Sequence, residues 1–246
     1  MLLCLAESAA LEHSRDFKGA YLAGATSVMR YETDLKTYYA RRASEYERIY
    51  IKPERQDDLA TLRGHVAAFC SDAHVLEYAC GTGYWTSVAA PHARTVLGID
   101  INQEVLEVAR NKPWPKNNVS FECSDLYELR ALAENYDTIL AVFLWSHILA
   151  EDLSAFYGVM HRHVKPGSRV MMLDNRYVEG SSTPIARTDK AGNTYQLRRL
   201  DDGGTFEILK NFPVRDRLIE SLTGEAKNFE YVELDYYWYL TYEVIV

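Results

Sequence analysis

The sequence has few cysteines, and they lie far apart. Its four cysteines are Cys4, Cys70, Cys80 and Cys123. No two of them form a CxxC pair, and none has a histidine at the spacing of a zinc site. We therefore expect free thiols, no metal site and a location in the reducing cytoplasm.

The sequence also lacks an apolar run long enough to cross a bilayer. Its longest apolar run, around residues 138–145, is far shorter than the roughly 20 residues that a membrane span needs. The first residues, MLLCLAESAAL, resemble a signal peptide only faintly, because no basic segment precedes them and Glu7 interrupts them early. We expect a soluble protein without a membrane partner.

Positive charge is scarce. The chain has 27 Lys and Arg against 35 Asp and Glu, which gives a net charge of -8 at pH 7. Proteins that bind nucleic acid neutralise phosphates with clustered Lys and Arg. The charge balance therefore argues against a nucleic-acid partner, and it leaves a monomer or a homodimer equally open.

Apolar residues are sufficient for one large domain. Of the 246 residues, 48% are hydrophobic and 25% are charged, a balance that supports a buried core and a solvated surface. We expect this domain to span residues 30–246. Residues 1–29 have no strong periodicity and are predicted to be a disordered or dispensable extension.

Short apolar segments alternate with helical patterns from residue 75 onward. The segments VLEYA, TVLGID, VSFECSD, YDTILAVFLW and RVMMLDN are typical of strands. Between them the pattern predicts helices over 84–90, 103–111, 126–133 and 153–164, the last of which Pro166 and Gly167 should stop. This alternation predicts an α/β, Rossmann-like and mostly parallel sheet with helices on both faces, and it places the core of the domain at residues 71–175.

The segments on either side of this core have other patterns. Residues 30–70 are predicted to hold two amphipathic helices, over 35–51 and 54–70, that form a lid at the mouth of the sheet. Residues 176–215 contain YQLRRL and TFEILK between turn signals, which predicts a small β insertion after the fifth strand. Residues 216–246 should form a helix and an antiparallel strand pair, which completes a seven-stranded sheet.

The segment LEYACGTG is the most informative about chemistry. An apolar strand ends at Glu77 and continues into a loop of small residues, Ala79, Gly81 and Gly83, where a cofactor can approach the backbone closely. The helix that follows leaves backbone N–H groups free at its N-terminus. Taken alone, the glycines are weak evidence for a cofactor, because a tight turn between a strand and a helix uses glycine anyway.

Two further acidic residues stand at the ends of the next strands. Asp100 ends TVLGID, where a carboxylate can accept from both ribose hydroxyls of an adenosine, although an Asp there could also be a helix N-cap. Asp125 follows VSFECS, where it can accept from an adenine amino group while Leu126 covers the ring. Because the carboxyl ends of parallel strands meet at one edge of a sheet, Glu77, Asp100 and Asp125 should converge there.

On these residues the chain resembles the class I S-adenosylmethionine-dependent methyltransferases that act on small molecules, over about residues 70–175. LEYACGTG is similar to the family's glycine-rich first motif, with Ala79 where many members have glycine, and FLWSHI is similar to its fourth motif. The resemblance implies an enzyme with S-adenosylmethionine as its cofactor. It implies that the cofactor contacts Glu77, Ala79, Gly81, Gly83, Asp100, Ile101, Asp125, Leu126 and Phe143.

Methyl transfer from a sulfonium is an in-line displacement, so alignment and exclusion of water supply much of the catalysis. A base is needed only when the acceptor must lose a proton. His147 is the candidate for that role, although it could equally pack against the following helix. The acceptor is expected to be a small molecule whose methylated atom the sequence does not identify. Its predicted contacts are Tyr38, Tyr39, Arg42, Trp145, Asn175 and Arg176.

Two other functions share part of this pattern. An NAD-dependent Rossmann dehydrogenase also combines a glycine turn with an acidic residue after the second strand. Its GxGxxG motif needs a third glycine or an alanine, whereas this chain continues from Gly83 with Tyr84, Trp85 and Thr86. A catalytically silent protein that binds S-adenosylmethionine would show the same motifs as the enzyme. The methyltransferase remains the leading prediction.

Overall fold

The computed structural model describes residues 34–245 except 115, 130–131 and 133–135. All of these lie in one compact unit, Tyr31–Val246. The extension predicted over residues 1–29 lies outside the described residues.

Seven strands form the main sheet, in the order β3-β2-β1-β4-β5-β10-β9. Strands β1 to β5 are parallel to one another, while β10 is antiparallel to both β5 and β9. The predicted α/β, Rossmann-like fold with an antiparallel C-terminal pair is confirmed. The strands are β1 His74–Tyr78, β2 Thr95–Asp100, β3 Val119–Cys123, β4 Tyr136–Val142, β5 Val164–Asn175, β9 Ala226–Glu233 and β10 Tyr237–Val244.

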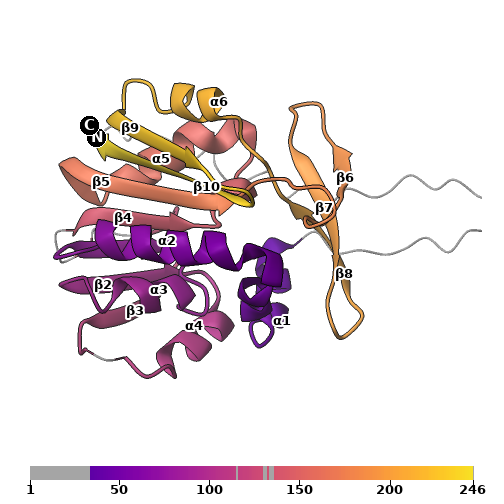
Figure 1. Cartoon of the computed structure of the whole chain (residues 1–246), viewed down its shortest axis with the longest axis horizontal. Coiled ribbons are helices and arrows are strands. Elements are labelled where there is room, and N and C mark those ends of the chain that lie inside the picture. The colour runs from indigo at the N-terminus through magenta and orange to yellow at the C-terminus, as the bar shows by residue number, and fades with distance from the viewer. Residues whose placement is uncertain (1–33, 115, 130–131, 133–135, 246) are drawn as a thin grey trace, which may run out of the picture. The chain divides into compact units, whose positions relative to one another are not determined.

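Helices cover both faces of this sheet (Figure 1). Because successive strand residues point to opposite faces, Val75 packs in the cluster under α2 and α3, and Leu76 packs in the cluster under α5 and α6. Both residues are fully buried, which explains why the central parallel strands, such as β1 and β4, are almost continuously apolar in sequence. The helices are α2 Gln56–Phe69, α3 Tyr84–Ala89, α4 Gln103–Arg110, α5 Leu153–His161 and α6 Arg215–Glu220.

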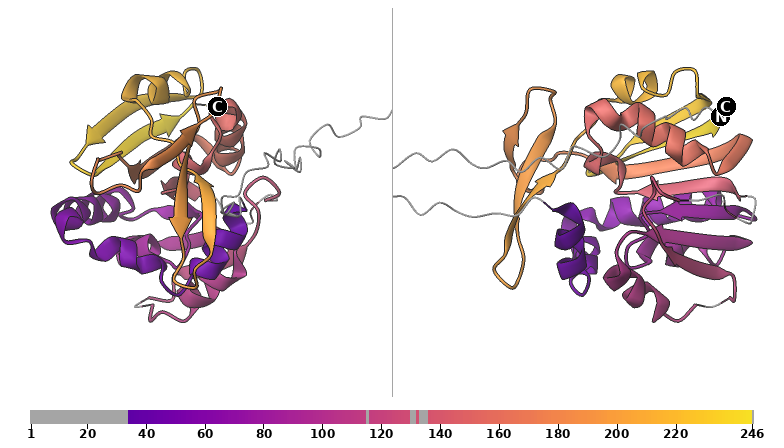
Figure 2. Two further views of the ribbon diagram at one scale, coloured as in Figure 1. Left: turned by 90° about the vertical axis from the view of Figure 1, so that its right-hand side faces the viewer. Right: turned by 180° about the vertical axis from the view of Figure 1, so that it is seen from behind.

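The insertion after β5 forms a separate three-stranded antiparallel sheet in the order β6-β7-β8. Its strands are β6 Ile185–Thr188, β7 Thr194–Arg199 and β8 Thr205–Leu209. Figures 1 and 2 show this sheet beyond one end of the main sheet, next to the first helix, α1 (Leu35–Arg42). Tyr38 of α1 is buried against Phe206 and Ile208 of β8, so the lid and the insertion pack together.

Three predicted helices differ from those observed. The segment 35–51 is α1 followed by a separate 3-10 helix, η1 (Tyr46–Ile51), and a second 3-10 helix, η2 (Pro53–Arg55), precedes α2. The helix predicted over 126–133 is absent from the described part of that segment, where residues 126–128 form a turn. The helix predicted over 153–164 ends at His161, because Val164 already pairs with Tyr136 of β4.

Candidate active site

A cavity of about 290 Å³ lies at the carboxyl ends of β1, β2 and β4 and is bordered by α1. The fold brings to its wall five residues that the sequence predicted for a cofactor. They are Ala79, Gly81, Asp100, Ile101 and Phe143. His147 and Tyr39 also line this cavity.

Asp100 fixes the loop that follows β1. One carboxylate oxygen, Oδ2, accepts from the N–H of Gly81 at 2.9 Å, and the other, Oδ1, accepts from the N–H of Asn102 at 2.9 Å. A carboxylate has about four acceptor positions, so both oxygens can accept further hydrogen bonds from a ligand. Burial raises the pKa of Asp100, and hydrogen bonds from ligand hydroxyl groups would favour its charged form.

The backbone is strained at two strand ends beside this cavity. Ala79, after β1, has φ 52°, and Phe143, after β4, has φ 57°. This left-handed conformation is uncommon for residues other than glycine and costs about 1 kcal/mol or more. Both residues line the same cavity, and strain of this kind clusters at functional sites.

Asn102 is a site residue that the sequence did not single out. It is 3% exposed, and its Oδ1 atom has no hydrogen-bond partner among the described residues. It precedes α4 without capping that helix through its side chain. Because buried polar atoms are nearly always satisfied, this acceptor in the cavity wall suits the hydroxyl or amino groups of an adenosine. Its place two residues after Asp100 is the sequence signal that could have identified it.

Four residues predicted for the cofactor lie away from the cavity wall. Glu77 is 2% exposed and accepts from the Thr86 hydroxyl at 2.5 Å. A Cβ atom on Gly83 would lie 3.2 Å from that of Ala109, so the glycine allows α4 to pack closely. The other two are Asp125, which accepts from the N–H of Tyr127, and Leu126, which packs against the core.

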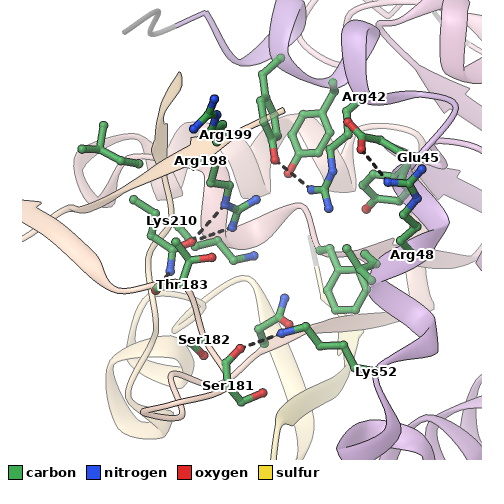
Figure 3. Close-up of a pocket in the computed structure, with 18 of the residues that line it drawn as sticks. Arg42, Glu45, Arg48, Lys52, Ser181, Ser182, Thr183, Arg198, Arg199 and Lys210 are labelled. Atoms are coloured by element: carbon green, nitrogen blue, oxygen red, sulfur yellow. Dashed lines mark hydrogen bonds and ion pairs between the residues drawn. The ribbon is translucent and has the colours of Figure 1, made fainter. Parts of the chain in front are cut away.

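A second cavity, of about 470 Å³, adjoins the first and shares Tyr39, Tyr46 and Phe143 with it. Four residues predicted for the acceptor line it, namely Tyr38, Tyr39, Arg42 and Asn175. Figure 3 shows that its side chains come from the helices before β1, from the segment 181–183 and from the inserted sheet. The two segments that flank the core in sequence therefore meet around one cavity.

His147 forms a hydrogen-bonded pair with Tyr39. Its Nδ1 atom lies 2.7 Å from the carbonyl oxygen of Leu209, and its Nε2 atom lies 2.8 Å from the Tyr39 hydroxyl. A carbonyl can only accept, so Nδ1 carries the hydrogen and Nε2 accepts from Tyr39. Burial, with Lys210 and Arg198 nearby, lowers the pKa of His147 to about 3, and the imidazole is neutral at pH 7.

Two residues predicted for the acceptor lie outside both cavities. Trp145 is buried in the core, where its Nε1 atom donates to the Tyr157 hydroxyl at 2.9 Å. Arg176 forms an ion pair with Glu233 at 2.6 Å and also donates to the carbonyl oxygen of Leu234. Trp145 thus packs between helix and sheet, and Arg176 holds the turn between β9 and β10. Their contact with an acceptor stays a prediction.

An ion pair that the sequence did not predict lies beside the shared wall. The Lys210 ammonium is 2.7 Å from the Asp174 carboxylate, and the side chains are 5% and 0% exposed. Lys210 also donates to the Ser146 hydroxyl at 2.5 Å, and its Nζ atom lies 6.0 Å from the centre of the Phe143 ring. The pair joins the insertion to the carboxyl end of β5.

Comparison with known proteins identifies the family. Residues 75–167 match the methyltransferase domain family. The solved structure of the DhpI-SAH complex matches with a TM-score of 0.69 and 26% identity, over 85% of this chain and 94% of DhpI. These findings support a class I S-adenosylmethionine-dependent methyltransferase, with residues 75–167 in its methyltransferase domain.

Similarity of this methyltransferase to curated enzymes is confined to part of the chain. The ubiquinone biosynthesis O-methyltransferase of Coxiella burnetii is 30% identical over 98 residues, which are 39% of this chain and 41% of that enzyme. The DhpI-SAM-HEP complex matches more widely, with a TM-score of 0.68 and 26% identity over 84% of this chain and 94% of that one. In the described part of the methyltransferase, no helix is long and apolar enough to cross a membrane.

Proposed function

We propose that this methyltransferase transfers a methyl group from S-adenosylmethionine to a small molecule. The observation that carries the proposal is the pair of adjoining cavities with a shared wall of Tyr39, Tyr46 and Phe143. The cofactor would bind in the 290 Å³ cavity and the acceptor in the 470 Å³ cavity. When bound, S-adenosylmethionine supplies an electrophilic methyl group on a sulfonium sulfur.

In this proposal the smaller cavity recognises adenosine. Asp100 and Asn102 offer acceptor atoms to the ribose, the Gly81 backbone lies open to the ligand, and Ile101 and Phe143 supply apolar walls. Glu77 and Gly83 act indirectly, by holding the loop and the helix that shape the cavity. A contact of Asp125 and Leu126 with adenine stays a prediction.

The larger cavity would hold the acceptor between the lid and the insertion. Residues 30–70 and 176–215 would thus select the acceptor, while the core over 71–175 binds the cofactor. His147 acts here as a positioning residue, because its Nε2 atom is occupied by the Tyr39 hydroxyl and its low pKa makes it a weak base. Tyr39, which lines both cavities, would set the position of the acceptor relative to the methyl group.

Asp100→Asn is expected to weaken binding of S-adenosylhomocysteine, the product form of the cofactor, by about 5- to 150-fold. The change keeps the shape of the side chain but removes the charged acceptor, and losing such hydrogen bonds costs about 1 to 3 kcal/mol. Calorimetric titration of the purified proteins measures the effect. Asp72→Asn is the matched control, because Asp72 is exposed and forms its ion pair with Arg94. Equal affinities for Asp100→Asn and the parent would remove Asp100 from the cofactor site.

A further inference from the structure

The larger cavity is strongly basic in a chain that is acidic overall. Its wall has seven Lys and Arg side chains but only two carboxylates, Glu45 and Asp201, whereas the chain has more acidic than basic residues. Both carboxylates already form ion pairs with Arg48. Figure 3 shows the cations on several sides of the cavity, with Arg42 and Arg48 opposite Arg198 and Lys52 below them.

Four of these cations form hydrogen bonds with neutral groups alone. Arg42 donates to the Tyr38 hydroxyl, Lys52 to the carbonyl oxygen of Ser181, Arg55 to the Ser181 hydroxyl and the Asn175 amide, and Arg198 to the Gln196 amide. None of the four forms an ion pair with a carboxylate of the described residues. Lys210, by contrast, is neutralised by Asp174.

Without a bound anion, this cluster of cations lowers the stability of the folded protein. Arg55 is 6% exposed, and Arg42, Lys52 and Arg198 are partly buried, so water solvates these charges incompletely. Burial, followed by the charge of Arg55, lowers the pKa of Lys52, which is the effect of like charges placed close together. An anionic ligand would remove this repulsion and gain charge-assisted hydrogen bonds.

We propose that the acceptor of this enzyme carries a tetrahedral dianion, such as a phosphate ester or a phosphonate, which binds among Arg42, Lys52, Arg55 and Arg198. The inference rests on the proposed function in taking the larger cavity as the acceptor site. Four cations without carboxylate partners exceed what one carboxylate can neutralise, which favours a doubly charged group. Guanidinium groups also present paired donors that match the oxygens of a phosphoryl group. The rings of Tyr38, Phe212 and Tyr237 would cover the organic part of the acceptor.

The test is calorimetric titration of the full chain with inorganic phosphate at constant ionic strength, with and without saturating S-adenosylhomocysteine. We expect phosphate to bind with a Kd of about 1 mM or lower, and acetate to bind at least tenfold more weakly. Arg198→Met and Lys52→Met should each weaken phosphate binding by about tenfold or more while S-adenosylhomocysteine affinity stays within about twofold. Arg94→Met, which removes an exposed cation paired with Asp72, is the matched control and should change neither affinity.

Several outcomes would overturn the proposal. Unchanged phosphate affinity in both folded variants would show that these cations do not bind the anion. Acetate binding as tight as phosphate would exclude the dianion. Competition between phosphate and S-adenosylhomocysteine would assign the cations to the carboxylate of the cofactor. If phosphate binds as expected but S-adenosylhomocysteine does not bind at all, the proposed function fails while the anion site stands.

Discussion

Lys210→Met is expected to lower the free energy of unfolding by about 3 to 5 kcal/mol, because it leaves the Asp174 charge buried without a cationic partner. Asp174 is fully buried, and Lys210 is its ion-pair partner at 2.7 Å. Burial alone would raise the pKa of Asp174, but Lys210 holds it below the usual value. Methionine keeps most of the apolar volume of lysine, so the loss of stability measures the effect of removing the charge and not of a change in packing. Denaturation in urea at pH 7 measures it.

The double variant K210M/D174N separates the ion pair from the packing around it. Removing both charges leaves no isolated ion in the core, so the double variant should be more stable than Lys210→Met alone. Arg94→Met is the control for an exposed pair, and its cost should stay below about 1 kcal/mol. A loss of stability below about 1 kcal/mol for Lys210→Met would mean that the ion pair contributes little to stability. The same would follow if the losses of the two single variants, K210M and D174N, simply added up to that of the double variant.

The contribution of Glu77 to the stability of the ligand-free protein should fall by about 3 kcal/mol as the pH rises from 5 to 8. Burial raises the pKa of Glu77 from its usual 4.5 to about 8. The folded state therefore keeps a proton that the unfolded chain releases above pH 4.5. Stability from this group is complete below pH 4.5 and declines until the pH reaches about 8, at no more than about 1.4 kcal/mol per pH unit.

Glu77→Gln isolates this contribution from the other titrating groups. Glutamine is neutral at every pH, and its carbonyl oxygen can still accept from the Thr86 hydroxyl. The difference in unfolding free energy between Glu77→Gln and the parent should therefore increase from pH 5 to pH 8. Chemical denaturation of both proteins at four pH values gives this difference. A constant difference across the series would mean that Glu77 is ionised in the folded state.

The sequence predicted the centre of the main sheet because burial on both faces makes strands such as β1 almost continuously apolar, as at Val75 and Leu76. The strand β6 was missed because all four of its residues are exposed, so no alternation marks it. The start of the helix predicted over 126–133 is a turn, because Asp125 accepts a hydrogen bond from the N–H of Tyr127.

Part of the site could also be read from the sequence. Gly81 and Asp100 follow strands that neighbour each other in the sheet, so their meeting in one cavity follows from the parallel topology. The partner of Asp174 could not be predicted in this way, because Lys210 is distant in sequence and belongs to the insertion. The hydrogen bond that Glu77 accepts from the Thr86 hydroxyl could not be predicted either, because it depends on how α3 packs on β1.

A parallel calorimetric titration of the parent protein with S-adenosylhomocysteine and with NAD tests most directly which cofactor the 290 Å³ cavity binds. We expect S-adenosylhomocysteine to bind and NAD not to bind. At a concentration of S-adenosylhomocysteine about 100 times its Kd, the protein should gain about 2.7 kcal/mol of stability, which is visible as a higher melting temperature. Binding of NAD, or a folded protein that does not bind S-adenosylhomocysteine, would contradict the assignment of the 290 Å³ cavity to the methyl donor.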